Sequence, residues 1–283
     1  MTRAAALLVV ALVAAGCAAS GDEDAALPTP ADSPVHVHGL GIDPADGSLY
    51  IATHTGLWRS APGERTARRV SESRQDTMGF TVVGPRRFLG SGHPDLRELD
   101  EGLPPHLGLI ASEDAGRSWR SVSLLGEADF HVLRAAGSTV YGWDATNARL
   151  LASSDGGDTW RVRPVPAEPV DLALDPRAPE RLVAATLDGL FVSADAGRTW
   201  SRLSSWVGLL AWPRSDLLFL MTAEGSVFVS ADAGATWEHR GEVGGEPAAL
   251  AGAGDGRLYA ALHDGTIKSS PDGARWALRV RPY

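Results

Sequence analysis

The chain carries one short pattern five times, and a clear copy is Ser193-Ala-Asp-Ala-Gly-Arg-Thr-Trp200. Near-complete copies also begin at Ser112, Ser153 and Ser230, and a worn copy begins at Ser269. Successive copies start about 40 residues apart, a spacing that indicates a chain built from repeated structural units. The shared pattern is S-x-D-x-G-x-[ST]-W.

Each residue type in the pattern suits a tight turn between two strands. Ser and Asp side chains can accept hydrogen bonds from turn backbone N–H groups, and Gly adopts positive φ at little cost. The Trp supplies a large apolar surface for packing. We therefore predict that the aspartates of the four good copies stabilise turns and take no part in catalysis: Asp114, Asp155, Asp195 and Asp232.

The segments between the copies predict four short strands per repeat. In the repeat around Ser193 these are 170–174, 181–185, 189–192 and 201–203. Four such strands make one propeller blade. Further blades are expected at 36–70, 77–122, 128–164, 205–240 and 246–282. We predict an all-β, six-bladed β-propeller whose patterned turns join the third and fourth strands; a seventh blade would need strands from the N-terminal leader.

The pattern resembles the Asp-box (BNR) repeat of sialidases, sortilin-type receptors and photosystem II assembly factors. The chain also resembles Asp-box lipoproteins that are often labelled glycosyl hydrolases or sialidase-like. The segments that carry this second resemblance are His36-Val-His-Gly-Leu-Gly41, Thr53-His-Thr-Gly56, Gly90-Ser-Gly-His-Pro94 and Leu103-Pro-Pro-His-Leu107. The resemblance implies the propeller fold, whereas the same scaffold hosts unrelated activities.

The N-terminus has the features of an export signal. An apolar run from Ala4 to Ala15 follows Arg3 and is too short to span a bilayer. Ala14-Ala-Gly-Cys17 resembles a bacterial lipobox, and Cys17 is the single cysteine of the chain. We expect a signal peptide over 1–16, lipidation of Cys17 and an acidic, Pro-containing tether over 17–35. A lipid-anchored protein on the extracytoplasmic face of the cell membrane follows, with 36–283 as one propeller domain.

The charge of the chain limits its partners. Lys and Arg number 26 against 35 Asp and Glu, for a formal net charge of −9 at pH 7. This acidity argues against a nucleic-acid partner. The membrane remains a partner through the lipid, together with an envelope protein, a metal or a glycan as the ligand.

Blade topology predicts one face on which ligands bind. First strands start at this top face and second-to-third-strand turns return to it, whereas the patterned turns lie on the opposite face. Seven of the eight histidines fall at top-face positions. The predicted ligand-binding face comprises His36, His38, His54, His93, Asp95, His106, His131, Asp144, Asp171, Glu224 and His263. A long second-to-third-strand connection over 91–107 adds a loop of the kind that often carries function.

The histidines suggest a transition-metal site. His36 and His38 stand two residues apart on an expected strand, so both side chains should leave the same side of it. Imidazole favours zinc and copper, and the expected ligands are His36, His38, His54, His93 and His131. Metal affinity should fall as pH drops through roughly 6.5, where histidine takes up a proton. Hydrogen-bonded histidines without an ion are the alternative.

Two other functions stay open. A glycoside hydrolase needs two carboxylates flanking the sugar, and the chain offers several without selecting a pair. A true sialidase is not expected, because the Arg-Ile-Pro motif of that family is absent and no top-face position carries an obvious arginine triad. An assembly or scaffold role is the other alternative. The sequence leaves open whether the protein is an enzyme, and if it is one, a glycosyl hydrolase is expected.

Overall fold

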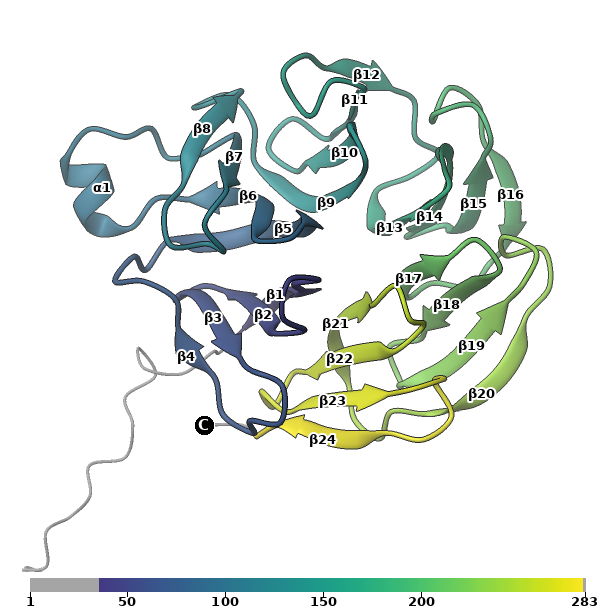
Figure 1. Cartoon of the computed structure of the whole chain (residues 1–283). Coiled ribbons are helices and arrows are strands. Elements are labelled where there is room, and N and C mark those ends of the chain that lie inside the picture. The colour runs from purple at the N-terminus through teal and green to yellow at the C-terminus, as the bar shows by residue number, and fades with distance from the viewer. Residues whose placement is uncertain (1–35, 282–283) are drawn as a thin grey trace, which may run out of the picture.

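The computed structural model describes residues 36–281, and the chain there is nearly all β-structure. Six four-stranded antiparallel sheets stand in a ring (Figure 1), which confirms the predicted six-bladed β-propeller. The only helix among these residues, α1 (Leu96–Asp100), lies in a loop, and none of the described helical structure could span a bilayer. The expected signal peptide, Cys17 and tether lie outside the described residues.

Each of the first three blades is a meander of four consecutive strands. Blade one contains β1 (Val37–Ile42), β2 (Leu49–Thr53), β3 (Gly56–Ser60) and β4 (Arg68–Arg69). Blade two contains β5 (Asp76–Gly84), β6 (Arg87–His93), β7 (Leu109–Ser112) and β8 (Arg120–Ser123). Blade three contains β9 (Phe130–Ala136), β10 (Thr139–Asp144), β11 (Arg149–Ser153) and β12 (Arg161–Arg163).

The last three blades follow the same plan. Blade four contains β13 (Pro169–Asp175), β14 (Ala178–Thr186), β15 (Gly189–Ser193) and β16 (Ser201–Ser204). Blade five contains β17 (Leu209–Arg214), β18 (Leu217–Met221), β19 (Ser226–Ser230) and β20 (Glu238–Glu242). Blade six contains β21 (Pro247–Gly252), β22 (Leu258–Leu262), β23 (Ile267–Ser270) and β24 (Ala277–Val280). The first strand of each blade lines the centre of the ring (Figure 1).

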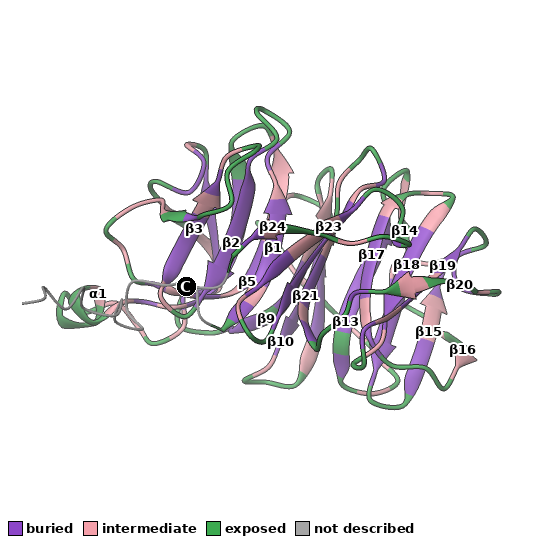
Figure 2. Ribbon diagram, turned by 90° about the horizontal axis from the view of Figure 1, so that it is seen from below, coloured by how far each residue is buried: buried purple, intermediate pink, exposed green. Residues whose placement is uncertain are grey.

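The hydrophobic core is divided among the blade interfaces. Six clusters of buried side chains occur in the described residues, and each joins two neighbouring blades. The buried residues follow the inner strands, and the exposed ones are concentrated in the turns (Figure 2). Burial of apolar surface between blades therefore stabilises the ring, because a single blade cannot cover its own faces.

The patterned turns join third to fourth strands, as predicted. In the turn after β15, Ser193 Oγ accepts from Gly197 N at 2.9 Å and donates to Asp195 Oδ1 at 2.8 Å. Asp195 then accepts from Thr199 N at 2.9 Å and from the Thr199 hydroxyl at 2.7 Å. The same bonds recur in the turns of Asp114, Asp155 and Asp232.

The Trp of each pattern packs against the preceding blade. Trp160 of blade three joins the cluster between blades two and three, and Trp200 of blade four joins the cluster between blades three and four. Blade one lacks a Trp in its turn, and buried Ala67 occupies the interface with blade six in its place, beside Trp58. Each patterned turn therefore fixes its own hairpin and also contributes to a blade interface.

Blade six is built entirely of C-terminal strands, so the ring closes without exchange of a strand between the two ends. Its inner strand β21 contacts β1. The Arg279 guanidinium donates to Ser60 Oγ at 2.8 Å and to the carbonyls of Ser60, Ala61 and Glu64. A charged side chain with several backbone acceptors thus joins the last blade to the first.

Candidate metal centre at the mouth of the ring

The end of the ring at which the first strands begin is called the mouth here, and the histidines gather there. Their positions are His36 before β1, His38 in β1, His54 in the β2–β3 turn, His93 at the end of β6, His106 in the connection 94–108, His131 in β9 and His263 between β22 and β23. The eighth histidine, His239, lies in β20, the outer strand of blade five, and pairs with Glu242 at 3.1 Å.

His38, His54 and Asp76 form a first cluster, group one, in which one ligand atom from each lies within 4.8 Å of the others. His54 Nδ1 is 2.7 Å from Asp76 Oδ2. His38 Nε2 is 3.7 Å from Asp76 Oδ1, which is too long for a hydrogen bond. His38 Nε2 and Asp76 Oδ1 are both buried and have no hydrogen-bond partner among the described residues.

The charge state of His38 suits metal binding. The pKa of His38 is lowered to about 4. Burial is the largest cause and the neighbouring His54 is the next, whereas Asp76 opposes the shift. The imidazole of His38 is therefore neutral at pH 7. A neutral ring with a free, buried Nε2 is the form that binds a metal ion.

His93, His106 and Asp129 form a second cluster, group two, with the same 4.8 Å limit between ligand atoms. His93 Nδ1 is 2.8 Å from the carbonyl oxygen of Pro105, to which only an N–H can donate, so Nε2 of the neutral ring keeps its lone pair. This Nε2 is 3.5 Å from Asp129 Oδ2. His106 Nδ1 and Asp129 Oδ1 are buried without a partner among residues 36–281.

His131 is the second partner of Asp129. Its Nε2 is 2.9 Å from Asp129 Oδ2, and this hydrogen bond raises the pKa of His131 despite partial burial. Burial alone would raise the pKa of Asp129, but the hydrogen bond from His131 and the nearby histidines outweigh it and hold the pKa below its usual value. Asp129 is therefore an ionised carboxylate with one oxygen bonded and the other free.

The segment Gly90-Ser-Gly-His93 positions both groups. Asp76 and His93 are register partners on β5 and β6. Gly92 has φ +138°, and a Cβ there would run into the carbonyl oxygen of Asp76 and the backbone nitrogen of Met78, so the close approach requires glycine. Buried Ser91 accepts from Phe130 N at 3.0 Å and so holds the start of β9 beside β6.

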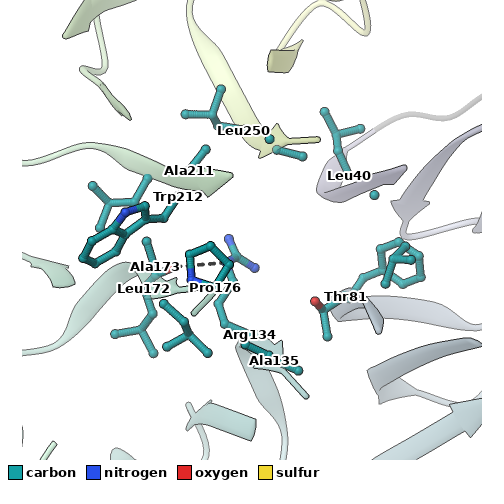
Figure 3. A pocket seen from close by; sticks show the side chains of 18 of the residues that line it. Leu40, Thr81, Arg134, Ala135, Leu172, Ala173, Pro176, Ala211, Trp212 and Leu250 are labelled. Carbon is teal, nitrogen blue, oxygen red and sulfur yellow. Dashed lines mark hydrogen bonds between the residues drawn. The ribbon is translucent and has the colours of Figure 1, made fainter. Parts of the chain in front are cut away.

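A hollow of about 290 Å³ opens at the mouth, with His36, His38, Met78, His131 and His263 in its wall. Deeper in the ring, a cavity of about 220 Å³ is lined by side chains from all six inner strands (Figure 3). Those labelled there include Leu40, Thr81, Arg134, Leu172, Ala211 and Leu250. Group one therefore lies beside a space that can hold a ligand.

Arg134 lies along the channel between the mouth and the deeper cavity, and it lines both the deeper cavity and the space above it. Its guanidinium donates to Asp171 Oδ1 at 2.6 Å and to the Leu172 carbonyl at 3.0 Å. Asp171 also accepts from Leu210 N, and burial raises its pKa. This ion pair forms part of the channel wall, and it gives Asp171 a structural role.

Three further residues expected at the ligand-binding face have other local roles. Asp95 caps α1, where it accepts from Glu98 N at 3.0 Å. Asp144 is fully buried and pairs with Arg149 at 2.8 Å. Glu224 is an exposed turn residue whose pKa is lowered by a hydrogen bond from its own backbone N–H. The topology places all three at the mouth, but none belongs to group one or group two.

The five expected metal ligands do not form one set. His38 and His54 belong to group one, His93 belongs to group two, and His131 bonds to Asp129. The ring of His36 lies 5.3 Å from that of His54, at the edge of group one. The expectation missed the two carboxylates that complete the groups, together with Met78 in the hollow.

Comparisons with known proteins support the fold. No protein-family profile matches the chain. The chain is 30% identical to the dispase autolysis-inducing protein of Streptomyces mobaraensis over 159 residues, which are 56% of this chain and 38% of that protein. It therefore spans about two fifths of this curated relative.

Solved propeller structures are similar at low sequence identity. The GH74 xyloglucanase from Xanthomonas campestris matches with a TM-score of 0.55 and 17% identity, over 87% of this chain and 46% of that one. An ancestral GH74 enzyme matches with a TM-score of 0.56 and 11% identity, over 86% of this chain and 37% of that one. YCF48 from Cyanidioschyzon merolae matches with a TM-score of 0.49 and 14% identity, over 89% of this chain and 86% of that one. This TM-score is too low for a residue-by-residue comparison.

Proposed function

We propose that this protein is a membrane-tethered, extracytoplasmic β-propeller that binds a transition-metal ion through His38, His54 and Asp76. The single observation that carries the proposal is the pair of buried atoms, His38 Nε2 and Asp76 Oδ1, that face each other without hydrogen-bond partners. Buried polar atoms are rarely left unpaired, because an unmade hydrogen bond costs about 1–3 kcal/mol. A metal ion between them would satisfy both.

The spacing of the ligand atoms suits such an ion. Zinc binds imidazole nitrogen and carboxylate oxygen at about 2.1 Å, so two ligands at a tetrahedral angle lie about 3.4 Å apart. His38 Nε2 and Asp76 Oδ1 are 3.7 Å apart. Small side-chain rotations would bring both into bonding range, and His54 supplies a third ligand atom.

Three protein ligands leave room for a further ligand from the hollow. Catalytic and ligand-exchanging zinc sites have this composition, whereas structural zinc sites take four protein ligands. Met78 lines the same hollow as His38, and a thioether close to imidazoles favours copper. We therefore propose zinc or copper as the ion, with an envelope protein or a small molecule as the ligand that completes the coordination.

The carboxylates at the mouth support metal binding over glycoside hydrolysis. Asp76 bonds to His54, and Asp129 bonds to His131. A two-carboxylate hydrolase requires one protonated acid, whereas the pKa of Asp129 is held low. The similarity to GH74 enzymes concerns the fold, and a panel of glycosides tests the hydrolase alternative directly.

Metal content of the purified protein tests the proposal. Zinc or copper should bind with a defined stoichiometry by calorimetry and elemental analysis. His38→Gln and His54→Gln should each remove one equivalent, with affinity at that site reduced at least about 100-fold, since loss of even an outer-shell partner costs 10–100-fold. The matched control is His239→Gln, which removes a carboxylate-paired histidine in the outer strand of blade five. Identical metal binding in all three variants, or no binding in the wild type, would contradict the proposal.

The tether is tested at Cys17. Its position after a lipobox-like run supports lipidation, and a lipid anchor with more than one chain holds a domain far better than a single chain. Cys17→Ala should release the protein from the membrane fraction or block its maturation, whereas Ser20→Ala should change neither. Normal maturation and membrane binding of Cys17→Ala would refute the anchor.

A further inference from the structure

Group two joins three separate parts of the chain. His93 ends β6, His106 belongs to the connection 94–108, and Asp129 directly precedes β9 of the next blade. A single ion bound there would link blade two, its long connection and blade three. Group one contains none of these residues, so the two clusters can be tested separately.

The connection 94–108 is held mainly near its two ends, where Arg74 N donates to Asp95 Oδ2 at 3.2 Å and Gly108 N donates to Ala128 O at 3.2 Å. Its helix α1 has no buried residue, and Leu96 is 81% exposed. Near its end, Leu107 N donates to Gly92 O at 2.9 Å, and the His106 carbonyl accepts from Gly126 N at 2.8 Å. These bonds position His106 over the start of β9, but they leave its side chain without a partner at Nδ1.

The side chains of group two are arranged as ligands already supported by an outer shell. The Pro105 carbonyl orients the His93 ring and leaves its Nε2 free. His131 bonds to Oδ2 of Asp129, and Oδ1, on a side chain only 6% exposed, is left without a partner. Metal-binding histidines and carboxylates characteristically have such second hydrogen bonds, which fix their orientation.

We propose that group two is a second metal site, separate from group one, in which zinc or a similar divalent ion fastens the connection 94–108 to the start of β9. Nε2 of His93, a ring nitrogen of His106 and a carboxylate oxygen of Asp129 supply the three ligands. The ion bound here holds the loop that borders the mouth, whereas the ion of group one faces the hollow.

Metal stoichiometry distinguishes the two sites. Wild-type protein should bind two equivalents of zinc, and His106→Gln or Asp129→Asn should bind one. His54→Gln should also bind one, and the double variant His54→Gln with His106→Gln should bind none. One equivalent in the wild type that only His54→Gln removes would overturn the second site and leave the proposed function standing. One equivalent in the wild type that only His106→Gln removes would leave the second site standing and overturn the proposed function.

Limited proteolysis tests the fastening of the loop. Arg97 is an exposed trypsin site within α1. With zinc at about 100 times its Kd, the opened form of the loop should fall about 100-fold, and cleavage after Arg97 should slow accordingly. The protection should persist in His54→Gln and vanish in His106→Gln and Asp129→Asn. Equal cleavage of the wild type with and without zinc would refute the fastening role.

Discussion

Asp76 and Asp129 each give one carboxylate oxygen to a histidine and keep the other oxygen buried and unpaired. An ionised carboxylate can accept about four hydrogen bonds, so this distribution leaves acceptor capacity unused on both side chains. The free oxygen of Asp76 lies 3.7 Å from His38 Nε2, whereas His93 Nε2 lies 3.5 Å from the oxygen of Asp129 that also bonds to His131. At the scale of single residues, the mouth is therefore organised around its carboxylates as much as around its histidines.

Asp195 illustrates a carboxylate with the opposite role, because its hydrogen-bonding capacity is used within its own turn. The hydroxyl and backbone N–H of Thr199 and the hydroxyl of Ser193 lower the pKa of Asp195 to about 2 from 3.8. The folded state therefore binds fewer protons than the unfolded state between about pH 4 and pH 2. The stability that Asp195 contributes is present above pH 4 and is lost as pH falls through 2.

Asp195→Asn should accordingly melt at a lower temperature than the wild type at pH 7, and the difference should shrink as pH falls from about 4 to 2. Thermal melting over this pH range checks the prediction, with Asp158→Asn, an exposed change in the neighbouring turn, as control. Metal binding at the mouth should be unchanged, since the turn lies at the opposite end of the ring. A constant melting difference across the range would show that the charge of Asp195 plays no part.

The histidines of the mouth could be predicted from the sequence, whereas their partners could not. Period and strand order place seven histidines at one end, because antiparallel meanders alternate direction with each strand. Asp76 stands at the start of β5, one residue before the expected start of the second blade, and no spacing signal marks it as a partner of His38 and His54. The contacts between these histidines and the aspartates depend on strand register and on side-chain direction across blades. The pairing of Asp76 with His93 is one example, and spacing along the chain does not predict such a pairing.

At the scale of elements, the hairpins were predictable because each is determined locally. Within the pattern, Ser bonds to Asp and Asp bonds to Thr, and each bond joins residues at most four positions apart, so the turn forms from its own sequence. The worn copy keeps part of this: Ser270 Oγ accepts from Gly273 N at 2.8 Å and bonds to Asp272 at 3.3 Å. The turn is one residue shorter, which is why the copy beginning at Ser269 aligned poorly.

The connection 94–108 shows the limit of that local information. The sequence marked it as a long loop, and Asp95 was expected at the ligand-binding face. In the structure Asp95 and Glu98 form a capping box, in which each side chain accepts from the other residue's backbone N–H. The spacing D-x-x-E is itself a helix-start signal. The placement of His106 beside Asp129, by contrast, depends on contacts with blade three that no local pattern contains.

At the scale of the whole molecule, the interface of blades one and six differs from the others. The patterned Trp that packs at the other five interfaces is replaced there by Ala67, and Arg279 bonds across to blade one. Arg279→Ala removes the charge-assisted hydrogen bonds to Ser60, Ala61 and Glu64. We expect the free energy of unfolding to fall by about 1.5–3 kcal/mol.

Urea denaturation of Arg279→Ala beside Arg281→Ala checks this expectation. Arg281 meets blade one through its backbone N–H to the Arg65 carbonyl, so its alanine variant should unfold near the wild-type midpoint. Coincident midpoints for all three proteins would mean that apolar packing alone closes the ring.

The point at which the chain enters the ring has a consequence for the distance between the mouth and a membrane. The described chain begins at His36, whose side chain lines the hollow at the mouth. With lipid on Cys17, the intervening 18–35 segment can extend at most about 60 Å, and it is attached at this same end. A tether of that reach would keep the mouth within about 60 Å of the bilayer and would leave the ring free to turn relative to it.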